Sequence, residues 1–141
     1  MPTSGHASAH ISEISPITES APGEEQWLPV RHFFGVRAFG VNAWVAREAG
    51  DLVIEDHDEV SGGAADHEEL YLVIGGHAEF VVDGETIDAP RGTFVHVREP
   101  RLRRSATGRE AGTTVLAIGA APGVAFQVSP WERRHVEAAS A

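Results

Sequence analysis

The feature that most constrains this chain is the way its apolar residues are grouped. From Trp27 onward they form short runs, and turn residues such as Gly, Pro and Asp interrupt them about every 8–12 residues. Short runs bounded in this way are typical of β-strands rather than helices. Many such strands in succession predict an all-β sandwich or a closed barrel. The nine candidate strands are residues 36–39, 41–47, 52–56, 69–74, 78–82, 86–89, 93–97, 102–106 and 113–119.

The turn residues support this prediction. Asp83-Gly84 lies between two apolar runs and predicts a two-residue hairpin, because both residue types tolerate the positive φ angles that the turn requires. Phe80 and Val82, two positions apart on the first strand of this hairpin, should share one face.

The two ends of the chain differ from the middle. Ser129-Pro130, followed by Glu132, combines a Ser N-cap, Pro at the first helical position and Glu at the third, and predicts a helix at 130–139. Trp131, His135 and Val136 could then face the barrel. Residues 1–25 are rich in Ser, Pro, Gly and Glu and indicate a polar tail, which could include a short strand at 11–17. The barrel with its helix would then occupy residues 26–141.

Composition excludes several functions. The 141 residues suit one domain, and their formal net charge of −10 disfavours binding to nucleic acid or to anionic membranes. The absence of Cys excludes disulfides, thiolate zinc sites and a Cys nucleophile, and all the basic residues are Arg, so no Lys can form a Schiff base. No apolar run approaches the ~18 residues of a membrane span. The N-terminal residues lack the features of a secretory signal, so we expect a cytoplasmic protein.

Two His-x-Glu pairs could carry chemistry. His57 and Glu59 follow one predicted strand, and His67 and Glu69 begin the next. Residues two apart on a strand share a face, so the two pairs could converge on one point. Imidazole and carboxylate ligands suit a divalent ion such as Mn, Fe, Ni or Zn. The alternative is that this segment is an exposed, charged hairpin end.

The order of these features resembles the cupin superfamily. The segment from Glu69 to Gly76 is similar to the second half of the first cupin motif, and Gly50 lies seven residues before His57, where that family has a Gly before its first metal-binding His. Pro90-Arg91-Gly92 resembles the turn that opens the second motif. The resemblance implies a double-stranded β-helix (cupin or jelly-roll barrel), usually a homodimer.

The resemblance also suggests individual roles. His57 matches the first His of the family's His-x-His pair, Glu59 stands in place of the second His, and Glu69 matches the motif Glu. His67 has no family counterpart. Counting the family's spacing from Gly92 leads to Arg103 where the fourth ligand, a His, would be expected.

Arg103 therefore has two possible functional roles. Because a guanidinium does not bind a cation, Arg103 could replace a metal as the counter-charge to Glu59 and Glu69, or it could hold an anionic substrate beside a metal. The alternative is that Arg101, Arg103 and Arg104 point to solvent.

The predicted cavity would be lined by aromatic residues. Tyr71 alternates with Glu69 and could point a phenol into the same space. Each wall candidate could instead be plain core. The candidates are Phe39, Trp44, Tyr71, Phe80, Phe94 and Phe126.

Two functions follow from these residues. The first is a metal-dependent enzyme acting on a small organic molecule, of oxygenase, isomerase or cyclase type. A divalent metal would be held by His57, Glu59, Glu69 and His67, with Arg103 and Tyr71 acting on the substrate. The second is a non-catalytic barrel that binds a small molecule without a metal, with Arg103 paired to the glutamates. Because the fold does not choose between them, both stay open.

Overall fold

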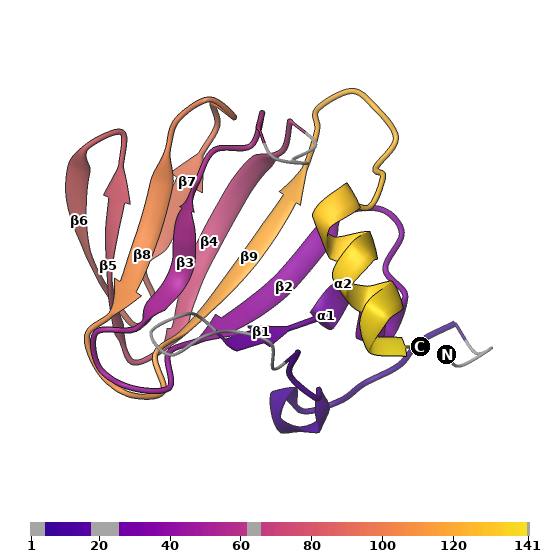
Figure 1. Ribbon diagram of the computed structural model, residues 1–141, viewed down its shortest axis with the longest axis horizontal. Coiled ribbons are helices and arrows are strands. Elements are labelled where there is room, and N and C mark those ends of the chain that lie inside the picture. The colour runs from indigo at the N-terminus through magenta and orange to yellow at the C-terminus, as the bar shows by residue number, and fades with distance from the viewer. Residues whose placement is uncertain (1–4, 18–25, 62–65, 141) are drawn as a thin grey trace.

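A computed structural model describes residues 5–17, 26–61 and 66–140 of the chain, with the side chains of 137–140 left out. Within these residues a short 3-10 helix, η1, and two α-helices accompany nine strands (Figure 1). The elements are η1 Ile11–Glu13, β1 Gln26–Leu28, α1 Val30–Phe34, β2 Gly40–Val45, β3 Leu52–His57, β4 Glu68–Gly75, β5 His77–Val82, β6 Glu85–Pro90, β7 Phe94–Val97, β8 Arg104–Gly108, β9 Thr114–Ala120 and α2 Pro130–Ser140.

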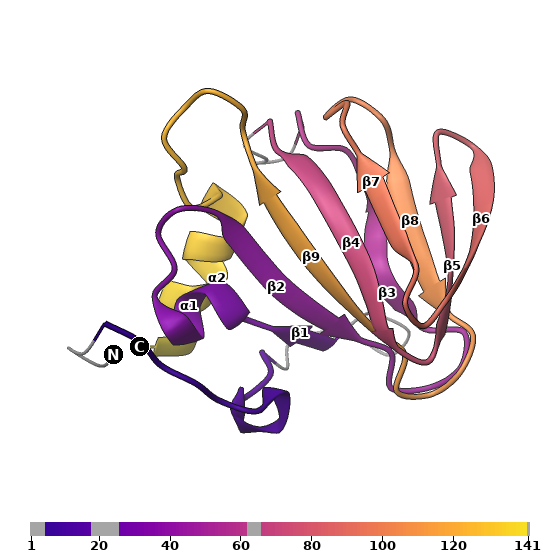
Figure 2. The ribbon, with the colours of Figure 1, turned by 180° about the vertical axis from the view of Figure 1, so that it is seen from behind.

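The strands form two antiparallel sheets that face each other. One has the order β1-β2-β9-β4-β7 and the other β3-β8-β5-β6 (Figure 2 shows the first sheet from its outer side). The prediction of an all-β jelly-roll barrel with a C-terminal helix is confirmed.

The predicted hairpin is also confirmed. β5 and β6 pair up to Val82 and Glu85, and Asp83 and Gly84 between them have φ angles of 50° and 79°. Phe80 is fully buried and Val82 packs against the same core, as alternation along the strand predicts.

The main core lies between the two sheets, where alternate residues of each strand point inward. In β4 these are Tyr71 and Val73, and in β9 they are Val115 and Ala117. Burying these apolar side chains contributes about 25 cal/mol per Å² and drives the two sheets together.

The C-terminal helix covers one end of the five-stranded sheet (Figure 1). Trp131 packs on Trp27 and Trp44, with ring centroids 5.2 and 6.1 Å away, and Val136 is buried. The carboxylate of Glu132, predicted to cap the helix, instead contacts Arg31 and Asn42. The helix is therefore held to α1 and β2 by both aromatic packing and a buried ion pair.

Two of the predicted strands are wrong. Residues 36–39 form no strand, because α1 ends at Gly35, whose left-handed φ of 70° turns the chain toward β2. Residues 11–17 contain η1 and a single bridge from Ile17 to Trp27 rather than a strand. Ile14 is buried against Leu28 and Ala43, so this part of the N-terminal segment covers the outer face of β2. The predicted domain boundary between residues 25 and 26 stays a prediction.

No helix among the described residues is long and apolar enough to cross a membrane.

Candidate functional site

A cavity of about 480 Å³ opens between the two sheets, beside the first turns of α2. Its walls come from β2, β3, β4, β9 and α2, so the site is assembled from segments distant in the sequence. A space of this size suits a small organic ligand.

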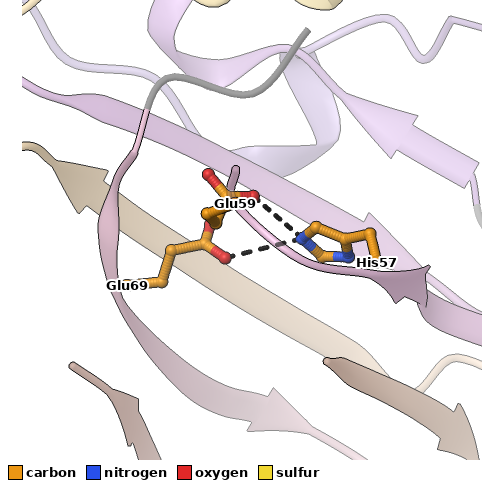
Figure 3. A group of neighbouring side chains, drawn as sticks. All are labelled: His57, Glu59 and Glu69. Carbon is orange, nitrogen blue, oxygen red and sulfur yellow. Dashed lines mark ion pairs between the residues drawn. The ribbon is translucent and has the colours of Figure 1, made fainter. Parts of the chain in front are cut away.

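Three of the predicted metal ligands meet at this cavity. His57 ends β3, Glu59 lies two residues beyond it, and Glu69 is the second residue of β4. His57 Nε2 lies 3.0 Å from Glu59 Oε2 and 3.6 Å from Glu69 Oε1 (Figure 3). One ligand atom from each residue lies within 4.8 Å of the others. The three side chains could therefore hold a metal ion.

Local backbone structure turns Glu59 inward. Asp58 Oδ1 accepts hydrogen bonds from the backbone N–H groups of Val60 and Ser61, which closes a turn directly after β3. The Glu59 N–H donates to the Pro100 carbonyl at 2.7 Å. With its backbone fixed on both sides, Glu59 directs its carboxylate toward His57 and is only 6 % exposed.

The protonation of His57 follows from its partners. Nδ1 lies 2.7 Å from the Glu55 carbonyl, which only accepts, so Nδ1 carries a proton and Nε2 faces the two glutamates. Burial alone would lower the pKa of His57, but hydrogen bonds to Glu59 and Glu69 outweigh it and raise this pKa from 6.5 to about 10. In the metal-free site His57 is an imidazolium at neutral pH.

Arg104, rather than the predicted Arg103, pairs with the site glutamates. The Arg104 side chain is fully buried, and its Nη1 lies 3.2 Å from Glu69 Oε1 and 3.9 Å from Glu59 Oε2. It pairs across strands with His57 and alternates with Ala106 on the inner face of β8. Its Nη2 donates to the Glu99 carbonyl at 3.3 Å.

Arg103 points the other way and is 59 % exposed. Its Nε lies 3.2 Å from Asp56 Oδ1, and its Nη1 lies 3.7 Å from Asp58 Oδ2, at the rim of the cavity. The prediction that Arg103 pairs with the glutamates is therefore wrong. The next residue, Arg104, pairs with them instead, and a shift of one residue along a strand moves the side chain to the other face of the sheet. The paired β3 and β8 shift register between Ile54 and His57, an irregularity that residue counting cannot detect.

Tyr71 reaches the cluster as predicted. Its hydroxyl donates to Glu69 Oε1, and the residue is only 1 % exposed. Burial, followed by the neighbouring Glu69 carboxylate, raises the pKa of Tyr71 well above its ordinary value. The phenol therefore stays neutral and acts as a donor. A catalytic role for Tyr71 stays a prediction.

His67 lies beside the cluster rather than within it. Its Nδ1 is 3.8 Å from Glu59 Oε1, and its ring packs on Phe126 at 5.5 Å. His67, directly before β4, faces Glu59 Oε1, whereas His57 faces the other carboxylate oxygen, Oε2. Among the described residues, the donor cluster consists of His57, Glu59 and Glu69 without it.

The predicted aromatic walls are partly correct. Trp44, Tyr71 and Phe126 line the cavity, whereas Phe80 belongs to the core. Phe39 and Phe94 lie outside, 41 % and 62 % exposed.

Sequence reasoning missed a second polar group in the cavity lining, contributed by β2 and α2. Asn42 Nδ2 donates to Glu132 Oε1 at 2.8 Å, and Arg31 Nε donates to the other oxygen of the same carboxylate. Asn42 and Glu132 both line the cavity and are 8 % and 3 % exposed. The one available signal was a polar residue, Asn42, inside the apolar run from Val41 to Val45.

Comparison with known proteins supports the fold. No family model matches the chain, and no curated protein matches it. Among solved structures, a cupin protein from Bacteroides fragilis superposes with a TM-score of 0.56 at 18 % identity, covering 79 % of this chain and 88 % of that one.

Two further structures are similar to this chain. A putative sugar phosphate isomerase from Acidithiobacillus ferrooxidans has a TM-score of 0.56 at 20 % identity. The superposition covers 70 % of this chain and 60 % of the isomerase chain. Pac13, a nucleoside dehydratase, has a TM-score of 0.56 at 15 % identity. The superposition covers 89 % of this chain and 98 % of the Pac13 chain. The chain therefore has the cupin fold, as the sequence resemblance implied.

Proposed function

We propose that this cupin-fold chain is an enzyme that moves a proton on a small organic molecule bound in the cavity, with no resident metal ion. The observation that carries the proposal is the buried guanidinium of Arg104, 3.2 Å from Glu69 Oε1. Arg104 supplies inside the barrel the positive charge that a metal would otherwise provide.

The charges within the cluster support this proposal. Glu59 and Glu69 are largely buried and would repel each other without a counter-charge. Arg104 and the His57 imidazolium offset the two carboxylates. Buried charges are tolerated when they are paired and hydrogen-bonded. Arg104 Nη1 donates to Glu69 and Nη2 to the Glu99 carbonyl, while its buried Nε has no acceptor among the described residues.

The same residues supply an acid and a base. A carboxylate of Glu59 or Glu69 can take a proton from the carbon beside a substrate carbonyl. The His57 imidazolium can donate a hydrogen bond to the carbonyl oxygen as that oxygen gains negative charge. The carboxylate then returns the proton to the same carbon, which gives exchange. Where that carbon carries a hydroxyl group, the carboxylate can instead return the proton to the former carbonyl carbon while the hydroxyl proton passes to the former carbonyl oxygen, which gives an isomerisation. The Tyr71 hydroxyl orients Glu69 for this task.

The structural neighbours agree with a small-molecule substrate. One is described as a putative sugar phosphate isomerase and another as a nucleoside dehydratase. These names belong to those proteins, and at this level of identity they support the proposal only through the shared fold.

A metal centre is the second candidate, and the donor geometry favours it. His57 donates Nδ1–H to a backbone carbonyl, as metal-bound histidines commonly do, and thereby aims Nε2 at the two glutamates. His57, Glu59 and Glu69 would hold the ion, which would supply Lewis-acid chemistry. The nearby Arg104 cation opposes this occupancy.

Deuterium exchange tests the proposed proton transfer. The chelator-treated protein would be incubated with dihydroxyacetone and with aminoacetone in D₂O, and proton NMR would follow exchange beside the carbonyl. We expect the wild type to accelerate exchange of at least one compound, and Glu69→Gln and Glu59→Gln to lose most of that acceleration. Exchange that is equal in the wild type and both variants would overturn the proposal.

A further inference from the structure

We propose that His67 is a second proton-transfer residue of the cavity and that it takes the proton of a substrate hydroxyl group, so that the substrate is a hydroxy aldehyde or a hydroxy ketone. This inference rests on the proposed function, because it adds a residue and a substrate class to the same site. It is carried by the place of His67 in the cavity lining, by the neighbours of its ring and by the ring nitrogen that they leave without a partner.

His67 belongs to the same cavity lining as the site carboxylates. It lines the cavity together with His57 and Glu69, and 9 % of its side-chain surface remains accessible. The ring makes no hydrogen bond with a described residue, yet neither ring nitrogen is among the side-chain atoms that are buried without a partner. The ring therefore keeps surface that a ligand in the cavity can reach.

The carboxylate beside the ring decides which nitrogen carries the proton. His67 Nδ1 faces Glu59 Oε1 at 3.8 Å, and separations of this kind often shorten once a substrate is bound. A carboxylate only accepts hydrogen bonds, so in the neutral ring the proton belongs on Nδ1. Nε2 then presents a lone pair and has no partner among the described residues. An imidazole in this form can take a proton from a hydroxyl group.

Gly119 allows His67 to lie next to Glu69. A Cβ atom at Gly119 would lie 3.4 Å from the Cβ of His67 and 3.2 Å from the Cγ of Glu69. Both side chains thus pack against the same bare backbone position of β9. The ring of Phe126 packs on the imidazole, with the ring centroids 5.5 Å apart. His67 is therefore held beside a carboxylate that can take a proton from carbon.

The two glutamates are placed for different tasks. Each oxygen of Glu59 faces an imidazole, because Oε2 lies 3.0 Å from His57 Nε2 and Oε1 faces His67. The contacts that Glu69 makes with described residues all reach its Oε1, which leaves Oε2 without a partner among them. Glu69 is therefore the carboxylate that takes the carbon proton, whereas Glu59 stabilises whichever imidazole is protonated.

The resulting isomerisation needs no co-reactant. Glu69 takes the proton from the carbon that carries the hydroxyl group, and His57 gives a proton to the carbonyl oxygen, which leaves an enediol. His67 Nε2 then takes the proton of the original hydroxyl group, whose O–H electrons form the new carbonyl bond. Glu69 returns its proton to the former carbonyl carbon, and the electron pair of the C=C bond forms this C–H bond. After product release, water carries the extra proton from His67 back to His57.

This role changes the ratio of two products. Without a base for the hydroxyl proton, the enediol returns to the starting compound, because Glu69 and His57 alone can reverse the first step. Such a site exchanges the carbon proton with solvent but does not isomerise. A residue that only supported the shape of the site would affect exchange and isomerisation alike. The ratio of isomerisation to exchange therefore reports the chemical role of His67.

Glyceraldehyde tests this role, because it carries a hydroxyl group beside its carbonyl. Chelator-treated wild type and His67→Gln would be incubated with glyceraldehyde in D₂O, and proton NMR would follow exchange beside the carbonyl and formation of dihydroxyacetone. We expect the wild type to do both. His67→Gln should form dihydroxyacetone about 100-fold more slowly, the usual contribution of an acid–base group, with exchange changed less than about threefold.

Two further variants and a second compound complete the design. His67→Asn removes the base at the Nε2 position, can still donate to Glu59, and should behave as His67→Gln does. His96→Gln, at an exposed position of β7 outside the cavity lining, is the matched control and should keep the wild-type ratio. Aminoacetone has no hydroxyl group, so its exchange should be the same in all four proteins.

The outcomes separate this inference from the proposed function. A wild-type ratio of isomerisation to exchange in His67→Gln or His67→Asn, or an equal loss of both reactions, would overturn the role of His67. A wild type that exchanges the proton of glyceraldehyde but forms no dihydroxyacetone would overturn the substrate class. A wild type that accelerates exchange of neither glyceraldehyde nor aminoacetone would reject the proposed function itself.

Discussion

Arg104 Nη1 lies 3.2 Å from Glu69 Oε1 in the closed interior of the barrel, where the arginine side chain has no exposed surface. A charge in this position is stable only while its partners remain. The pair links β8 of one sheet to β4 of the other. The central charge of the site therefore also contributes to holding the sandwich together.

Removing Arg104 should destabilise the fold strongly. Arg104→Met leaves Glu59 and Glu69 without this counter-charge and should lower the free energy of unfolding by about 3–5 kcal/mol, measured by urea denaturation. Arg103→Met, the adjacent exposed residue, is the control and should change it by about 0.5 kcal/mol or less. Similar losses in both variants would show that Arg104 is not the buried counter-charge.

Stability should depend on pH through His57. Its pKa is 6.5 when unperturbed and about 10 in the folded, metal-free protein, because Glu59 and Glu69 stabilise the imidazolium. This contribution is fully present below pH 6.5 and is lost as the pH rises through 10. The melting temperature should therefore fall over this range, and His57→Gln should flatten the fall. His67→Gln is the control, and a His57→Gln profile parallel to wild type would contradict the assignment.

The buried carboxylate of Glu132 should hold α2 in place. Glu132→Ala leaves Arg31 and the Asn42 amide without their partner, so it should lower the free energy of unfolding by about 3 kcal/mol. Tryptophan fluorescence should shift to the red if Trp131 loosens from Trp27. Arg133→Ala, on the exposed side of the same helix, should leave both readouts unchanged. An unshifted spectrum with unchanged stability would show that the ion pair does not hold α2 in place.

We expect a homodimer, formed by the outer face of the five-stranded sheet. Phe94 is 62 % exposed there, next to its cross-strand partner Leu72, and Ile74 is 41 % exposed (Figure 2 shows this sheet). Phe94→Glu should therefore give a monomer by light scattering. Phe33→Glu, on α1, should leave the dimer intact. A monomeric wild type at micromolar concentration would rule the dimer out.

The fold was predictable because its signals are local. Alternating apolar residues and the Asp83-Gly84 turn each act over a few positions, and the family resemblance then suggested how the strands are arranged. The strand period of two also suggested that His57 and Glu59 lie together, although Glu59 reaches His57 through the turn after β3 and not from the strand itself. The strand prediction for residues 36–39 was wrong because a short apolar run does not distinguish a strand from the segment after a helix.

The rest of the site depends on contacts that no local pattern contains. Which arginine enters the barrel is decided by the register of β8 against β3, and that register shifts next to His57. Asn42 and Glu132 meet across 90 positions of sequence, because α2 folds back over β2. Spacing along the sequence can suggest that an arginine belongs to the site. Only the pairing of strands and helices decides which arginine faces the cavity.

The central claim is that Arg104 and His57, rather than a metal ion, balance the charge of Glu59 and Glu69. Elemental analysis of the protein, purified without a His tag and without chelators, tests it most directly. The account predicts clearly substoichiometric Mn, Fe, Ni and Zn, and a melting temperature that does not change when EDTA or any of these ions is added. One tightly bound metal ion per chain, lost in His57→Gln together with a fall in melting temperature on chelation, would contradict it.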